Sequence, residues 1–129
     1  MEGLTMKSTI EKTQDIIWYH CNVNRRERVA HGRIIGRQFL VKAGSEVKEL
    51  RANTSLTSES VAYKLRLKLE KQGIIAKGCF MTEYVFDNPS VALKVIRATS
   101  QGNLNEWVDD EGRTIKHRWG STKTEVVEL

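Results

Sequence analysis

The side chains of this sequence best suited to nucleophilic or metal chemistry are histidines and cysteines: His20, Cys21, His31, Cys79 and His117. A cysteine beside a histidine can act as a thiolate nucleophile, and the two residue types together can bind zinc. No Cys-x-x-Cys or His-x-x-x-His spacing is present, so we predict neither a metal site nor a cofactor. A cysteine–histidine pair assembled by the fold stays open, although such thiols are more commonly buried and inert.

The run Asp109-Asp110-Glu111 offers carboxylates that could bind a cation. It stands directly before Gly112, and aspartate with glycine is the composition that tight turns favour. We therefore interpret the run as a solvated hairpin turn and keep cation binding as the less favoured alternative.

The segment Asn88-Pro89-Ser90 has the composition of a helix start that can bind an anion. The amino end of a helix presents free amide groups and the positive end of the helix dipole. Ser90 adds a hydroxyl there, and Lys94 follows one turn later. We predict an anion site at Asn88 and Ser90, with plain helix capping as the alternative.

The chain is basic, with 21 Lys and Arg against 16 Asp and Glu. The basic residues concentrate in the first half, whereas acidic residues gather between positions 106 and 111. The predicted nucleic-acid contacts are basic residues in polar loops or off the apolar stripes: Arg25, Arg26, Lys64, Lys68, Lys94 and Arg118. Contacts should be mainly to phosphate, because no helix with base-reading side chains is evident. An ordinary solvated surface is the alternative.

Tryptophans interleaved with basic residues are a second feature that nucleic-acid binding can use. Trp119 stands in the basic stretch 116–119 and could lie exposed. Trp107 lies in a predicted hairpin strand, where a tryptophan is more often part of the core than a stacking platform for a base.

The elements that position these residues begin with strands. Residues 15–23 are dense in β-formers, and residues 29–35 and 37–42 predict a hairpin that bends at Gly36. Phe80–Phe86 alternates with period two, which predicts another strand. Residues 107–115 predict a final hairpin around the acidic turn.

Two helices are predicted, near Thr57–Gln72 and Pro89–Thr99, from apolar residues at helical spacing. Ser55, Thr57 and Ser58 offer hydroxyl caps at the first start, and Gly73 suits its end. The predicted core combines the apolar stripes of these helices with two aromatic side chains: Val61, Leu65, Leu69, Phe86, Ala92, Ile96 and Trp107.

The period pattern predicts an α+β fold, a small antiparallel sheet with two main helices packed on one face. We expect a flexible arm over residues 1–14, a single domain over 15–117 and a tail over 118–129. No apolar run approaches the ~20 residues of a membrane helix, and no signal peptide is visible. We therefore expect a cytoplasmic location with reduced thiols and no membrane partner.

A family resemblance rests on an ordered series of short motifs between His20 and His117 rather than on one motif. The motifs are Phe39-Leu-Val41, Gly44-Ser45, Ser55, Arg66, Leu69, Gly73-Ile-Ile75, Tyr84-Val-Phe86, Asn88-Pro-Ser-Val-Ala92, Trp107 and Gly112-Arg-Thr-Ile115. Together they resemble the family of the domain of unknown function 4357, a module that commonly follows GIY-YIG nuclease domains. The series is also similar, more loosely, to domains associated with restriction enzymes and adenine methylases. It departs from the family at Asn88, where serine is usual, and at Gly102-Asn-Leu104, where Asn-Gly-Trp is usual.

The resemblance implies the company of DNA-cutting and DNA-modifying systems, but this chain carries no GIY-YIG strands. We therefore expect a non-catalytic accessory module that contacts DNA phosphates. The alternative is a protein-interaction module that recruits or regulates a partner nuclease or methylase. The acidic turn and the uneven charge distribution would then form the surface that binds the partner. An enzyme of unknown class is the third and least favoured hypothesis, because the sequence shows no combination of nucleophile, base and oxyanion site.

Overall fold

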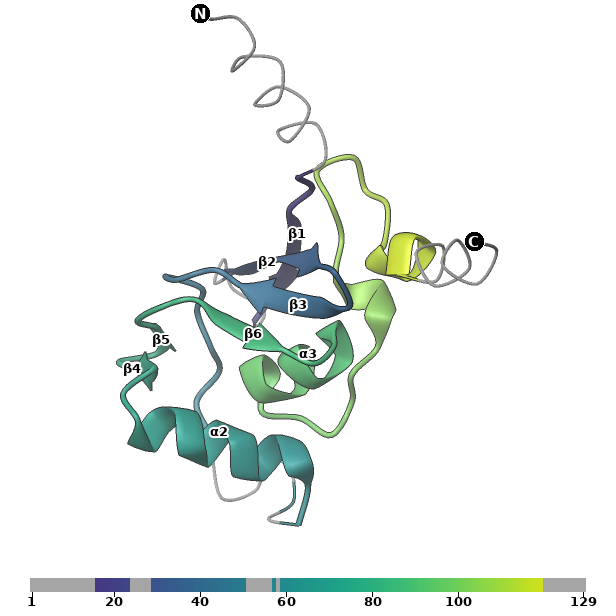
Figure 1. Ribbon diagram of the computed structural model, residues 1–129. Helices are drawn as coiled ribbons and strands as arrows, with labels where there is room; N and C mark the ends of the chain where they lie inside the picture. The colour runs from purple at the N-terminus through teal and green to yellow at the C-terminus, as the bar shows by residue number, and fades with distance from the viewer. Residues whose placement is uncertain (1–15, 24–28, 51–56, 58, 120–129) are drawn as a thin grey trace, which may run out of the picture.

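The computed structural model describes residues 16–23, 29–50, 57 and 59–119 (Figure 1). Along the chain its elements are β1 (Tyr19–Asn22), β2 (Val29–Ile35), β3 (Gln38–Val41), α2 (Val61–Lys71), β4 (Ile75–Ala76), β5 (Cys79–Phe80), β6 (Tyr84–Phe86), α3 (Pro89–Arg97) and the 3-10 helix η1 (Leu104–Glu106). Residues 115–119 are also helical. The predicted arm over residues 1–14 lies outside the described residues.

Four strands form one antiparallel sheet in the order β1-β2-β3-β6, and β4 pairs with β5 in a separate hairpin. The β2–β3 hairpin bends at Gly36, whose φ of +61° is a conformation that glycine adopts without strain, as the sequence predicted. The tight turn between β4 and β5 places both Lys77 and Gly78 at positive φ, which is typical of a two-residue hairpin loop.

The two faces of this sheet differ in composition because side chains alternate along each strand. The inner face is apolar and buried, and it carries Tyr19, Cys21, Ala30, Phe39, Val41 and Phe86. The opposite face, here called the outer face, carries His20, His31, Arg33, Leu40, Lys42 and Val85, with Trp18 just before β1. Gly32 lies under the Phe39 ring, and a β-carbon there would come within 2.5 Å of it.

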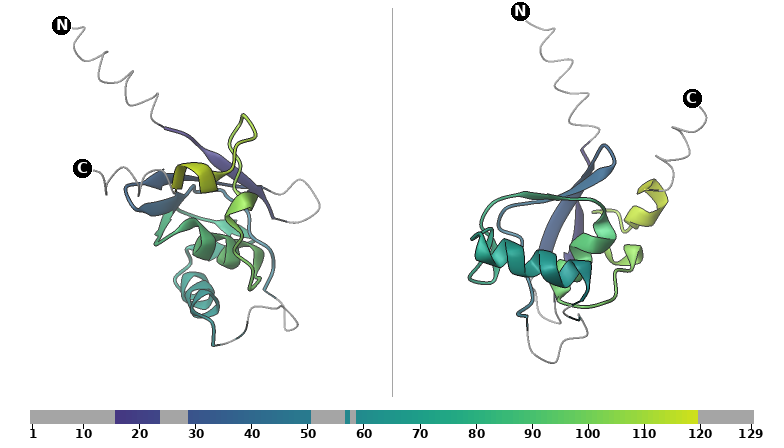
Figure 2. Two further views of the ribbon diagram at one scale, coloured as in Figure 1. Left: turned by 90° about the vertical axis from the view of Figure 1, so that its right-hand side faces the viewer. Right: turned by 60° about the horizontal axis from the view of Figure 1, so that its bottom comes forward.

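Both main helices lie on the inner side of the sheet. α3 packs directly against β3 and β6, and α2 packs against α3 and β4. The left view of Figure 2 shows the resulting order of sheet, α3 and α2. The predicted α+β architecture is therefore confirmed, with the refinement that α3 separates α2 from most of the sheet.

Helix α2 begins later than predicted and presents a different face to the core. Its cap is Ser60, whose hydroxyl accepts hydrogen bonds from the amides of Ala62 and Tyr63, while the proposed caps Ser55 and Ser58 lie outside the described residues. Val61 is 75% exposed, so its assignment to the core was wrong. As the first helical residue it precedes the buried stripe that starts at Ala62.

The buried stripe of α2 follows Ala62, Arg66 and Leu69, and Leu65 packs half-buried against the core. Gly73 at φ +78° follows the C-cap Gln72, as the sequence predicted. The remaining predicted core residues, Leu69, Phe86, Ala92, Ile96 and Trp107, are all buried.

The predicted strand Phe80–Phe86 is interrupted. Phe80 ends β5, the chain bends at residues 81–83, and only Tyr84–Phe86 joins the large sheet. The Met81 amide donates a hydrogen bond to the Ile74 carbonyl, with an N–O distance of 2.7 Å. Phe80 and Phe86 are both buried as alternation predicted, but they lie in two short strands that belong to different sheets, and Thr82 between them is exposed.

Helix α3 starts as predicted, with Asn88 as cap and Pro89 in the first turn. It ends earlier than predicted, because Ala98 adopts a left-handed conformation at φ +53°. The final hairpin is reduced to single bridges from Val108 to His20 and to Thr114. Ile115, expected in a strand, instead opens the helical segment 115–119, which runs past the predicted domain boundary at residue 117.

Candidate functional site

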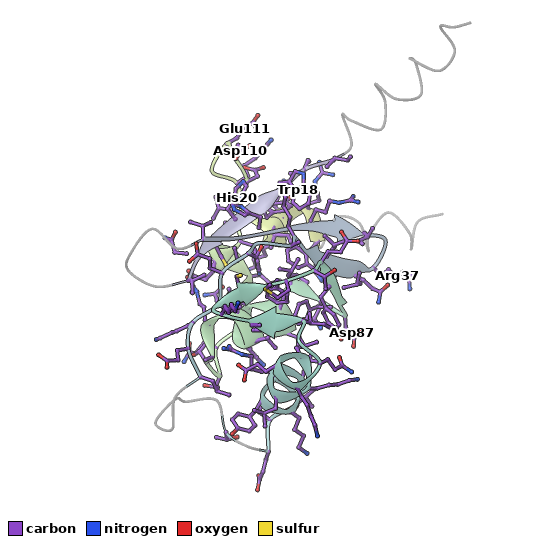
Figure 3. All side chains as sticks on the ribbon, turned by 90° about the vertical axis from the view of Figure 1, so that its left-hand side faces the viewer. Trp18, His20, Arg37, Asp87, Asp110 and Glu111 are labelled. Atoms are coloured by element: carbon purple, nitrogen blue, oxygen red, sulfur yellow. The ribbon has the colours of Figure 1, made fainter. Side chains whose placement is uncertain are left out.

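The outer face of the sheet carries an aromatic side chain flanked by cations. The Arg33 guanidinium carbon lies 5.7 Å from the centre of the Trp18 ring, and the Lys42 ammonium lies 5.3 Å from it. These distances are within the range of cation–π attraction. Neither α2 nor α3 covers this face, and Figure 3 shows Trp18 and His20 on the side of the sheet away from α2. The cluster of Trp18, Arg33 and Lys42 is called the Trp18 platform below.

The strand register explains how the platform forms. β1 and β2 pair Tyr19 with Gly32, so continuing the ladder by one residue sets Trp18 opposite Arg33. Lys42 follows β3, and its amide donates to the His31 carbonyl at 2.9 Å, which fixes it beside β2. Residues distant in sequence therefore meet on three adjacent strands, where the backbone holds their relative positions.

A chain of side-chain hydrogen bonds adjoins the platform. The Nδ1 atoms of His20 and His31 are 2.7 Å apart, and His20 Nε2 lies 2.9 Å from Asp110 Oδ1. One imidazole must donate and the other accept, so the pair holds one proton between the two Nδ1 atoms. Asp110 Oδ1 accepts a hydrogen bond from the Nε2–H of His20, and this contact joins the acidic turn to β1.

The electrostatic surroundings of His31 disfavour its protonation. Partial burial lowers the pKa of His31, and the charges of His20 and Lys42 lower it further, while Asp110 opposes them. A second proton on the histidine pair would place two N–H donors against each other. Neutral His31 is therefore the form that suits the folded protein.

This depressed pKa predicts a pH dependence of stability. Because His31 takes up a proton more readily in the unfolded chain, whose histidine pKa is about 6.5, the free energy of unfolding should fall as pH drops below that value. Urea unfolding at pH 7.5 and 5.5 should show a lower midpoint at pH 5.5, and His31→Gln should reduce that difference. His117→Gln, at an exposed position, is the control. An equal pH effect in the parent and in His31→Gln would contradict the assignment.

The acidic turn is held together by its own first residue. Asp109 Oδ1 accepts from the amides of Glu111 and Arg113, both at 2.9 Å, and these hydrogen bonds lower the pKa of Asp109. The Arg113 guanidinium pairs with Asp109 and Glu111. Among the described residues, no group of three or more histidine, cysteine or acidic side chains is arranged to hold a metal ion.

Those of the predicted nucleic-acid residues that the structure describes do not gather on one surface. Lys64 and Lys68 are exposed on α2, the helix that lies beyond α3 on the inner side of the sheet (Figure 1). Lys94 is half-buried on α3 beside Gly102. Arg25 and Arg26 lie outside the described residues.

Arg118 belongs to the helical segment 115–119 and lies beside the buried Tyr19 hydroxyl. Burial raises the pKa of Tyr19, and the charge and hydrogen bond of Arg118 oppose this shift. Trp119, whose exposure the sequence left open, is half-buried and packs against the core. The helix turns it inward beside Ile115.

The polar atoms proposed to bind an anion have partners within the protein. Asn88 Oδ1 accepts from the Val91 amide at 2.8 Å, which is the helix-capping alternative. The Ser90 hydroxyl donates to the Gly102 carbonyl at 2.8 Å and ties the loop after α3 to the first turn of that helix. A β-carbon on Gly102 would approach Ser90 Oγ to 2.3 Å, so this contact requires glycine.

The thiols occupy different environments and do not pair with a histidine in any described contact. Cys21 is buried on the inner face, and this burial raises its pKa to about 12, which suppresses the thiolate. Cys79 is half-buried in β5, and its thiol donates to the Ala76 carbonyl at 3.7 Å.

A groove of about 450 Å³ lies on the α3 side, lined in part by Asn22, Lys48, Arg97 and Glu106. Its main charges are already paired, because Arg97 donates to the Asn22 carbonyl at 2.7 Å and meets Glu106 at 3.1 Å. The groove therefore offers less unpaired positive charge than the outer face.

The sequence interpretation missed the Trp18 platform, although a signal for it was present. Within residues 15–23, Trp18 and His20 alternate with the apolar Tyr19 and Cys21, which indicates a polar and aromatic second face. What the sequence lacked was the register that brings Arg33 and Lys42 to that face.

Comparison with known families gives one match. The family model described as Domain of unknown function (DUF4357) matches residues 19–119, which includes all the named strands and both main helices. No curated protein and no solved structure matches the chain. Within the described residues, no helix combines the length and apolar character needed to cross a bilayer.

Proposed function

We propose that this chain, which belongs to the family described as Domain of unknown function (DUF4357), is a non-catalytic accessory module that associates with nucleic acid through its outer face. The observation that supports this most is the Trp18 platform, an aromatic ring with Arg33 and Lys42 on either strand of the β2–β3 hairpin. Cations interleaved with an aromatic ring suit phosphate contacts and base stacking together.

Phosphate contacts would supply most of the affinity. Arg33 and Lys42 make cation–π contacts with Trp18, which contribute only about 0.5–1 kcal/mol at exposed sites. Each cation that neutralises a phosphate releases counterions, which makes affinity depend steeply on salt. The exposed Arg37 in the β2–β3 turn would extend the positive surface along the hairpin.

The family resemblance suggests the setting for this module. The ordered motifs resemble a domain that accompanies GIY-YIG nucleases, and more loosely domains of restriction and adenine-methylation systems. We therefore place this chain in the cytoplasm beside a nuclease or methylase, where it would supply DNA affinity and leave the chemistry to its partner.

A protein-interaction module is the second candidate, and the acidic turn favours it. Asp110 is 87% exposed and Glu111 is 71% exposed, so their charges are available to a basic partner surface. In that case the turn, tied to β1 by His20, would recruit or regulate a partner enzyme.

The test is fluorescence anisotropy of labelled oligonucleotides, both duplex and single-stranded, titrated with the full chain over a series of salt concentrations. We expect binding at low salt, and we expect the logarithm of the association constant to fall linearly with the logarithm of the salt concentration. A chain that binds neither form even at low salt would overturn the proposal and favour the protein-interaction candidate.

A further inference from the structure

We propose that the outer face binds single-stranded nucleic acid in preference to duplex, with a base stacked at Trp18 and the neighbouring phosphates on Arg33 and Lys42. This inference rests on the proposed function and names the form of its ligand. It is carried by the shape of the sheet, by the surroundings of Trp18 and by the charge of the face.

The shape of the outer face does not fit a duplex groove. It spans the four strands β1-β2-β3-β6, and strands spaced about 4.8 Å apart extend over about 14 Å. The major groove of DNA is about 12 Å wide and admits a helix or a two-stranded ribbon. Trp18 lies at the start of β1 on this broad face, so it reaches bases only where they are already splayed out.

The surroundings of Trp18 allow an exchange of partners on binding. In the free protein Arg33 and Lys42 lie over the ring, and such contacts are worth about 2- to 5-fold in an equilibrium constant. Stacking of a base on an aromatic side chain is worth about 5- to 150-fold. A base that displaces the cations from the ring loses these two contacts, gains a stacking contribution of at least similar size, and frees the cations to bind its phosphates.

The charge of the outer face selects a polyanion. Arg33 and Lys42 flank the ring and supply the positive charge beside it. The acidic turn lies beside Trp18 and shares a pocket with it, where Asp110 bonds to His20 and Arg113 pairs with Asp109 and Glu111, so the positive charge of the face lies on the β2 and β3 side of the ring. A strand running from β1 toward β3 would keep its phosphates over the basic side chains.

The test compares a labelled 12-nucleotide thymidine strand with a 12-base-pair duplex by anisotropy, using the full chain. We expect the single strand to bind at least 10-fold more tightly than the duplex. Trp18→Leu should weaken single-strand binding by about 5- to 150-fold, whereas Trp18→Phe should keep most of the affinity because a ring remains. Lys68→Ala, on α2, is the matched control and should bind as the parent does.

Three further readouts keep the result interpretable. Urea midpoints of the Trp18 variants identify any loss of folding, and Lys42→Ala tests the platform without altering the ring. A saturating concentration of the thymidine strand should quench the tryptophan fluorescence of the parent and of Trp18→Phe by different amounts, because only the parent has an indole at position 18. Polyglutamate of similar charge should bind far more weakly than the strand.

The outcomes separate this inference from the function on which it rests. Duplex binding as tight as single-strand binding, with Trp18→Leu unaffected, would overturn the single-strand inference and leave nucleic-acid association standing. Equal binding of polyglutamate would also overturn it, because charge alone would then explain the affinity. Absence of binding to both oligonucleotides would overturn the proposed function itself.

Discussion

Replacing Arg66 with leucine should lower the free energy of unfolding by about 2–6 kcal/mol, because two carbonyls lose their donor at about 1–3 kcal/mol each. Arg66 is only 2% exposed, and it forms an ion pair with Glu70 at 2.7 Å. Its two terminal nitrogens donate to the carbonyls of Val95 and Lys48, at 2.7 Å and 2.8 Å. The leucine variant would leave these carbonyls without that donor.

The Arg66 contacts matter because they finish the end of α3. The last carbonyls of a helix have no partners within it. In α3 the Lys94 carbonyl accepts from the Thr99 amide, the Ile96 carbonyl accepts from the Lys48 amide at 2.7 Å, and Arg66 serves Val95 between them. A positive charge at a helix C-terminus also suits the helix dipole. Arg66 thus joins α2, α3 and the segment around Lys48.

Urea unfolding followed by circular dichroism measures this effect. Lys68→Leu is the matched control, since it makes the same change at an exposed position on the same helix and should alter stability by at most about 0.5 kcal/mol. Arg66→Lys should fall between the two, because an ammonium cannot reproduce the forked geometry of a guanidinium. Equal midpoints for Arg66→Leu and Lys68→Leu would refute the assigned role.

Trp107→Ala should cost about 3–5 kcal/mol, which is a large part of the 5–15 kcal/mol typical of a domain. Trp107 is fully buried, and its ring centre lies 4.7 Å from that of Phe39 on β3. Its indole N–H donates to the Pro89 carbonyl at 3.0 Å. The residue therefore links the sheet, the start of α3 and the C-terminal segment.

Trp107→Phe separates the ring from its hydrogen bond. Phenylalanine keeps most of the apolar contact but leaves the buried Pro89 carbonyl without its donor, so the expected loss is about 1–3 kcal/mol. Guanidinium unfolding monitored by far-UV circular dichroism gives both values, and the phenylalanine variant remains measurable if the alanine variant does not fold. An unchanged midpoint for Trp107→Ala would show that this core is arranged differently.

Much of the fold was predictable because local chemistry and tertiary structure agree. Asn88-Pro89 marks the start of α3, Gly73 marks the end of α2 and Gly36 marks the hairpin bend. The assignment of Val61 to the core was wrong because the apolar character of a residue in the first helical turn does not reveal which way that turn faces. The continuous strand predicted over Phe80–Phe86 is wrong because Phe80 pairs with Ile75 in the β4–β5 hairpin and the Met81 amide bonds to Ile74, pairings that alternation alone does not reveal.

The candidate site was harder to predict, because its members meet only through strand register. Arg66 looked like one of several surface charges on a basic helix, yet its spacing from Ala62 and Leu69 places it on the buried stripe. Trp18, Arg33 and Lys42 come from three segments, and only the pairing of β1, β2 and β3 brings them together. The distribution of basic residues along the sequence therefore led to predicted contacts on α2, whereas the Trp18 platform depends on strand pairing.

The most direct test of this account compares the salt dependence of oligonucleotide binding for two double variants. One is Arg33→Ala with Lys42→Ala on the outer face, and the other is Lys64→Ala with Lys68→Ala on α2. Each lost phosphate contact lowers the log–log salt slope by about 0.7 on single strands and about 0.9 on duplex. The account predicts that the outer-face pair lowers the slope by about two such contacts while the α2 pair leaves it unchanged. A slope that falls only in the α2 pair would contradict the account and place the contact surface on that helix.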